Sequence, residues 1–148
     1  MRPYLAMIVL VSFAVFEAGC DENLSTLAGP TPRLEPTFAS IQREIFESTD
    51  SSGRLACVNC HTDQGRTPAG LMNLRPEVAY DQIVNVRSVE QPALLRVQPG
   101  DPDASYLVHK LEGRVGISGR RMPFTPPYMS EGQILILRRW IEIGAPRN

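Results

Sequence analysis

The chain is predicted to form one small all-α domain. Its 148 residues give room for a single domain, and its 13 prolines are the main departure from ordinary globular composition. No run of alternating apolar residues is long enough to propose a sheet. Four stretches instead place apolar residues at helical spacing. The formal net charge of -1 gives no electrostatic basis for nucleic-acid binding.

The first two helices are expected over residues 37–47 and 76–85. In the first, the apolar residues fall at i, i+3, i+7 and i+8, so they share one face. These residues are Phe38, Ile41, Ile45 and Phe46. The second begins at Pro76, a residue suited to a first helical turn.

The third and fourth helices carry clear end signals. Residues 103–112 have an apolar stripe that includes Leu107, Val108 and Leu111, and Gly113 follows as a stop. In the last helix, Ser130 and Gln133 form a capping box, residues 134–143 are strongly apolar, and Gly144 ends the helix. Trp140 is expected to pack this helix against Phe38, Ile41 or Ile45 in the first.

The N-terminal 36 residues are expected to lie outside the domain. Residues 1–19 have one arginine, an apolar run over 5–16 and small residues at the end, which is typical of an export signal. Cys20 follows Ala18-Gly19, a pattern that resembles the lipobox of bacterial lipoproteins, whose cysteine is diacylated. Glu17 stands where that motif carries an aliphatic residue, so a plain secretory signal is the alternative. Residues 20–36 would supply the anchor cysteine and a polar, proline-rich tether.

The segment Cys57-Val58-Asn59-Cys60-His61 indicates a covalently bound haem. Two cysteines at this spacing can add to the two vinyl groups of one porphyrin, and His61 then supplies the proximal nitrogen. A zinc site would need further ligands, and only Cys20 and His109 remain. A redox disulfide of the thioredoxin type would need a βαβ pattern around the motif, whereas a polar loop precedes it.

The order of these parts resembles a bacterial monohaem c-type cytochrome over residues 37–148. Further likenesses are the segment that begins Pro99-Gly100-Asp101-Pro102, Arg121-Met122-Pro123, and the C-terminal run from Trp140 to Ala145. The resemblance implies a cytochrome c-like fold around one haem c, with His61 and Met122 as the axial ligands of the iron. It also implies that the carbonyl of Pro68 accepts the second ring proton of His61. Leu71, Leu74 and Leu95 are expected to wall the porphyrin.

His109 is the rival sixth ligand. It lies about 200° around its helix from Leu107, so it is expected to be exposed to solvent. Met122 is therefore favoured, because Met/His ligation is an established cytochrome c pairing.

The function implied by the resemblance is single-electron transfer, without enzymatic activity, on the periplasmic side of a bacterial membrane. Redox partners would be a dehydrogenase, an oxidase or a reductase, and the chain would be a separate carrier or a subunit of a larger oxidoreductase. A basic rim of Lys110, Arg114, Arg120 and Arg121 would steer an acidic partner, or else these side chains are solvated or bind the haem propionates.

Two alternatives from other classes remain open. If Met122 does not ligate, the iron is five-coordinate and could bind a small ligand or peroxide. If no haem is attached, the chain is a structural lipoprotein with a disulfide between Cys57 and Cys60.

Overall fold

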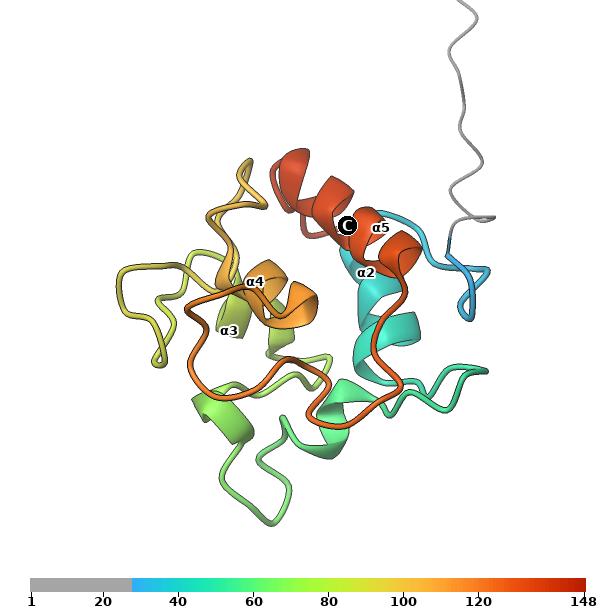
Figure 1. Ribbon diagram of the computed structural model, residues 1–148, viewed down its shortest axis with the longest axis horizontal. Helices are drawn as coiled ribbons and strands as arrows, with labels where there is room; N and C mark the ends of the chain where they lie inside the picture. The colour runs from blue at the N-terminus through green and yellow to red at the C-terminus, as the bar shows by residue number, and fades with distance from the viewer. Residues whose placement is uncertain (1–27) are drawn as a thin grey trace, which may run out of the picture.

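The computed structural model describes residues 28–148, so the predicted export signal and Cys20 lie outside the described part of the chain. Residues 28–36 were expected to belong to the tether, but they pack on the domain, because Ala28 and Leu34 are buried in its core. Helices are its regular elements, joined by long loops (Figure 1). Residues 28–148 contain no strand, only three isolated bridges between short extended segments. The α-helices are α2 (Phe38–Ile41), α3 (Ala79–Ile83), α4 (Tyr106–Glu112) and α5 (Glu131–Glu142).

The first predicted helix is present in two parts. Thr37 caps the start of α2, because its hydroxyl accepts a hydrogen bond from the Ser40 amide at 3.2 Å. The chain then continues as a π-helix, η1 (Gln42–Phe46). The apolar residues of the predicted face are all buried, as expected: Phe38, Ile41, Ile45 and Phe46.

Helix α3 is shorter than the predicted span of 76–85. Residues 76–78 form a turn, and Val84 adopts an extended conformation directly after Ile83. The cause is a competing set of hydrogen bonds: the Val97 amide donates to Ile83, and the Asn85 amide donates to the Val97 carbonyl. These bonds to a distant segment take the place of further helical bonds.

Helix α4 begins at Tyr106, three residues later than predicted, and ends as predicted at Gly113. Its start is delayed because Asp101 and Ser105 form a local turn, in which the Ser105 hydroxyl donates to the Asp101 carbonyl at 2.8 Å. Gly113 has φ of 72°, the left-handed conformation that glycine adopts without a steric penalty.

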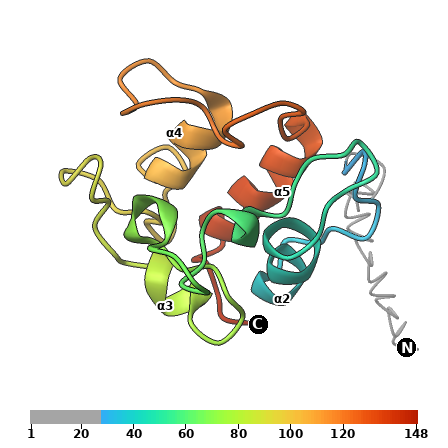
Figure 2. The ribbon, with the colours of Figure 1, turned by 90° about the horizontal axis from the view of Figure 1, so that it is seen from below.

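Helix α5 lies beside both α2 and α4 (Figures 1 and 2). Its capping box between Ser130 and Gln133 is confirmed, with both reciprocal hydrogen bonds present. Trp140 is fully buried, and its ring centroid lies 5.8 Å from that of Phe38, so the predicted contact between the two helices is also confirmed. Within residues 28–148, no helix is long and apolar enough to cross a membrane.

Candidate functional site

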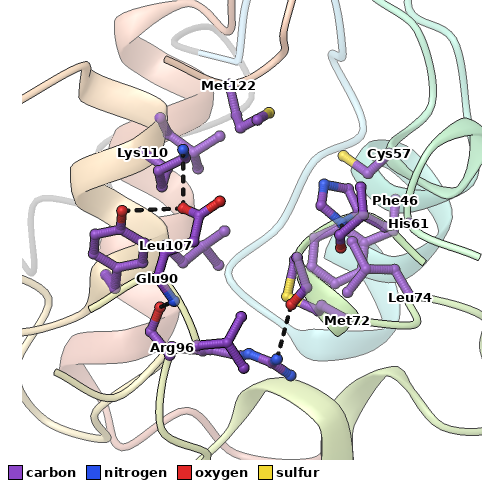
Figure 3. A pocket seen from close by; sticks show the side chains of 16 residues that line it. Phe46, Cys57, His61, Met72, Leu74, Glu90, Arg96, Leu107, Lys110 and Met122 are labelled. Atoms are coloured by element: carbon purple, nitrogen blue, oxygen red, sulfur yellow. Dashed lines mark hydrogen bonds and ion pairs between the residues drawn. The ribbon is translucent and has the colours of Figure 1, made fainter. Parts of the chain in front are cut away.

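A cavity of about 140 Å³, open to solvent at its mouth, lies between the Cys57–His61 segment and α4 (Figure 3). Most of its lining is apolar. The apolar side chains of the lining are Phe46, Ala69, Met72, Leu74, Val89, Leu107, Leu111 and Met122.

The cysteine motif forms a tight turn at the edge of the cavity. Cys57 begins the 3-10 helix η2 (Cys57–Asn59), and the His61 amide donates to the Cys57 carbonyl at 2.9 Å. Cys57 and His61 both line the cavity, whereas Cys60 is exposed and lies outside the lining. The turn therefore brings one thiol and the imidazole to the same cavity wall.

The imidazole of His61 is held by a backbone carbonyl. Its Nδ1 lies 2.8 Å from the Ala69 oxygen, and since a carbonyl only accepts, Nδ1 carries the proton. Nε2 is then the nitrogen available as a ligand. The prediction that Pro68 supplies this carbonyl is wrong: the Pro68 oxygen accepts from Leu71, because residues 69–71 close into a 3-10 turn that turns the Ala69 carbonyl towards His61.

The environment keeps both His61 and Cys57 uncharged. Burial lowers the pKa of His61 below 6.5, although the hydrogen bond to Ala69 opposes the shift, so the ring is neutral at pH 7. Burial raises the pKa of Cys57 to about 11, and the positive charge of Arg54 offsets this only in part. The Cys57 thiol lies 3.4 Å from the Ile45 carbonyl and is protonated at neutral pH.

Met122 lies on the cavity wall across from His61, and its sulfur faces the cavity (Figure 3). Its amide donates to the Lys110 carbonyl at 2.8 Å, which ties the Met122 loop to α4. Met72 also lines the cavity but lies on the same side as His61, while buried Met129 does not line it. Of these three methionines, Met122 is the one placed to face the imidazole.

His109 does not reach the cavity. It is partly exposed, and its Nε2 lies 2.6 Å from the Asp103 carbonyl on the outer side of α4. Among residues 28–148, His61 is thus the one imidazole that lines the cavity. This position agrees with the expected orientation of His109.

Two charged groups that sequence reasoning missed line the cavity: Glu90 and Arg96. Glu90 accepts from Lys110 and from the Tyr106 hydroxyl, each at 3.1 Å. Arg96 is buried and donates to backbone carbonyls. The sequence offered one signal for Arg96: this residue lies in the otherwise apolar run 94–97. Charged residues are rare in protein interiors, so an arginine in such a run is unusual.

One expectation from the sequence, the set of leucines that wall the cavity, is corrected. Leu74 lines the cavity as predicted, but Leu71 and Leu95 do not, because the left-handed turn at residue 71 directs the Leu71 side chain to solvent.

Of the expected basic rim, Lys110 lines the cavity, and Arg114, Arg120 and Arg121 lie outside its lining. Arg114 pairs with Asp103 and Glu112, so its charge is neutralised locally. Arg120 and Arg121 stack on the rings of Phe124 and Tyr128.

No protein-family model, curated protein or solved structure matches the chain. Within residues 28–148, no three His, Cys, Asp or Glu side chains come together as a metal site.

Proposed function

We propose that this chain is an exported monohaem c-type cytochrome that carries single electrons between redox proteins. The observation that carries the proposal is the joint placement of Cys57, His61 and Met122 around one largely apolar cavity. Cys57 and Cys60 would form the thioether bonds, and His61 and Met122 would be the axial ligands.

The lining residues fit a haem in both chemistry and charge. The porphyrin face is apolar, as is most of the wall. Arg96 brings positive charge to the same cavity, whereas Lys110 is paired with Glu90 there; a net positive charge suits the carboxylates of a haem. Neutral His61 presents Nε2 without first losing a proton.

His61 and Met122 would hold the iron of a haem between them, and the group would then supply one-electron transfer with no coordination position open to a substrate. The protein's own part is to hold the ligands and exclude water. The Ala69 carbonyl holds the imidazole ring, and the bond between Met122 and Lys110 holds the methionine loop. The apolar wall lowers the local dielectric constant around the site.

The proposed location is the periplasmic face of a bacterial membrane, with Cys20 as a lipid anchor. The exported protein should incorporate labelled palmitate, and replacing Cys20 with serine should abolish the label without loss of colour. A wild-type protein that takes up no label would refute the anchor and leave the electron-transfer proposal intact.

The deciding experiment is the visible spectrum of the protein exported in a host that attaches haem c. We expect sharp low-spin bands after dithionite reduction and, in the oxidised protein, a methionine-to-iron charge-transfer band. Met122→Ala should abolish that charge-transfer band. Met72→Ala is the matched control, because Met72 lines the same cavity on the side of His61 and should leave the band in place.

Other results would favour the alternatives. A high-spin spectrum in the wild type would favour a five-coordinate haem that binds a small ligand or peroxide. One observation supports that second candidate: Glu90 places a carboxylate at the cavity, where it could move a proton. A colourless protein would refute haem attachment and favour the disulfide between Cys57 and Cys60.

A further inference from the structure

The turn formed by residues 69–71 has two consecutive residues in the left-handed conformation. Gly70 has φ of 61° and Leu71 has φ of 49°. Glycine adopts this conformation freely, but leucine does so rarely. The Leu71 side chain is 61% exposed, so its own packing does not hold it there. Some other contact must keep the turn in place.

Arg96 supplies that contact. One guanidinium nitrogen, Nη2, donates to the carbonyls of both Gly70 and Leu71, each at 3.1 Å. The other, Nη1, donates to the Gln82 carbonyl at 2.7 Å, so the arginine also joins the turn to the end of α3. Arg96 is only 7% exposed, and no carboxylate in residues 28–148 forms an ion pair with it.

The same turn presents the carbonyl that holds His61. The Ala69 oxygen, one residue before Gly70, accepts from His61 Nδ1 at 2.8 Å and from the Met72 amide at 3.3 Å. We infer that Arg96 is a positioning residue for the proximal histidine, which fixes the Ala69 carbonyl against the ring by holding the left-handed turn. This role rests on the proposed haem-binding function.

The hydrogen bond between His61 and the Ala69 carbonyl should affect the reduction potential of the iron. A hydrogen bond from Nδ1 to a carbonyl makes the imidazole a more basic ligand, which favours the oxidised iron. A looser turn would weaken that bond and raise the reduction potential.

Replacing Arg96 with lysine tests the hydrogen-bonding geometry of the side chain while its positive charge is kept. Lysine lacks the planar fork that reaches several carbonyls at once. Loss of the charge would act in the opposite direction, because a nearby cation favours the reduced iron.

The test uses the haem-loaded protein and two readouts. In the reduced protein, solvent exchange of the His61 Nδ1 proton is followed by NMR, and the midpoint potential is measured by titration. We expect Arg96→Lys to speed the proton exchange at least tenfold and to raise the potential. Arg87→Lys is the control, since Arg87 lies in the same loop region, bonds one carbonyl and does not line the cavity.

A rescue variant tests the proposed route. Asparagine tolerates the left-handed conformation better than leucine, so adding Leu71→Asn to Arg96→Lys should restore slow exchange at least in part. If Arg96→Lys does not fold, Gly70→Ala perturbs the same turn with Arg96 in place. A Cβ at Gly70 would meet nothing within 4 Å, so its effect would come from the positive φ alone.

The outcomes separate this role from the proposed function. Wild-type exchange and potential in haem-bearing Arg96→Lys, or in Gly70→Ala where Arg96→Lys does not fold, would overturn the role of Arg96 alone. A colourless wild-type protein would overturn the proposed function, and the positioning role with it.

Discussion

Replacement of Asp50 with asparagine is expected to lower the free energy of unfolding by about 3–5 kcal/mol at neutral pH. The Asp50 and Arg54 side chains are both fully buried, and Arg54 Nε lies 3.0 Å from Asp50 Oδ2. Arg54 also donates to carbonyls at the end of the first helix and to the Leu55 carbonyl, two residues before Cys57. The substitution leaves this cation buried without its partner.

Asparagine cannot take over the hydrogen bonds of Asp50. One carboxylate oxygen accepts from Ser52 and from the Arg54 amide, and the other accepts from Arg54 Nε and Gln133 Nε2. An amide group in either orientation would direct N–H groups at donors. The cost is therefore expected in the upper part of the range for single substitutions.

The contribution of Asp50 should also depend on pH. Burial alone would raise the pKa of Asp50, but hydrogen bonds from Ser52 and Gln133 and the charge of Arg54 lower it from 3.8 to about 2. At about 1.36 kcal/mol per pH unit, this difference is worth about 2.4 kcal/mol. Since the folded pKa is the lower one, the stabilisation is present above pH 4 and is lost as the pH falls towards 2.

The assay is urea denaturation of the wild type and D50N between pH 2 and pH 7. The difference between the two proteins should narrow by about 2 kcal/mol from pH 5 to pH 2. Asp81→Asn is the control, because Asp81 pairs with Arg147 at the surface and should cost less than about 1 kcal/mol. A loss below about 1 kcal/mol in D50N, or a difference that does not change with pH, would refute the reasoning.

Three further substitutions test the packing and the caps. Trp140→Ala should cost about 3–5 kcal/mol in thermal or urea unfolding, because this fully buried ring lies in the core beside α2; a loss under about 1 kcal/mol would contradict that position. Ser130→Ala should cost about 1 kcal/mol through loss of its bond to the Gln133 amide, measured by the same unfolding curves, and no change would refute the cap. Gly113→Ala should destabilise the chain by about 1–2 kcal/mol, since it forces a side chain into positive φ and puts a Cβ 3.0 Å from Arg121 Cδ; a stabilised variant would contradict this geometry.

Local sequence signals predicted the helix ends well. The capping box at Ser130 and the glycine stop at Gly113 depend on residues within a few positions of each other, and both are present as expected. The start of α4 and the end of α3 were placed less well. Near the start of α4, the Ala104 amide donates to the Asp101 side chain, and at the end of α3 the Ile83 carbonyl accepts from the distant Val97 amide. The spacing of apolar residues along the helices does not indicate either hydrogen bond.

The residues of the candidate site were likewise predicted in part from the sequence. The motif at residues 57–61 and Met122 could be singled out from their spacing and order in the chain, while the attached haem itself stays a prediction. The carbonyl that holds His61 was assigned one residue too early. A backbone acceptor has no side-chain signature, and its direction depends on a turn with two left-handed residues.

The amphipathic faces, the caps and a cysteine-histidine motif whose chemistry follows from its spacing can all be read from the amino-acid sequence. The sequence does not show that Glu90 and Arg96 line the same cavity as Cys57 and His61, a placement that the folded chain creates. These contacts depend on the path of the irregular loops between residues 62 and 105. Along those loops, long-range hydrogen bonds rather than periodic patterns decide which side chains meet.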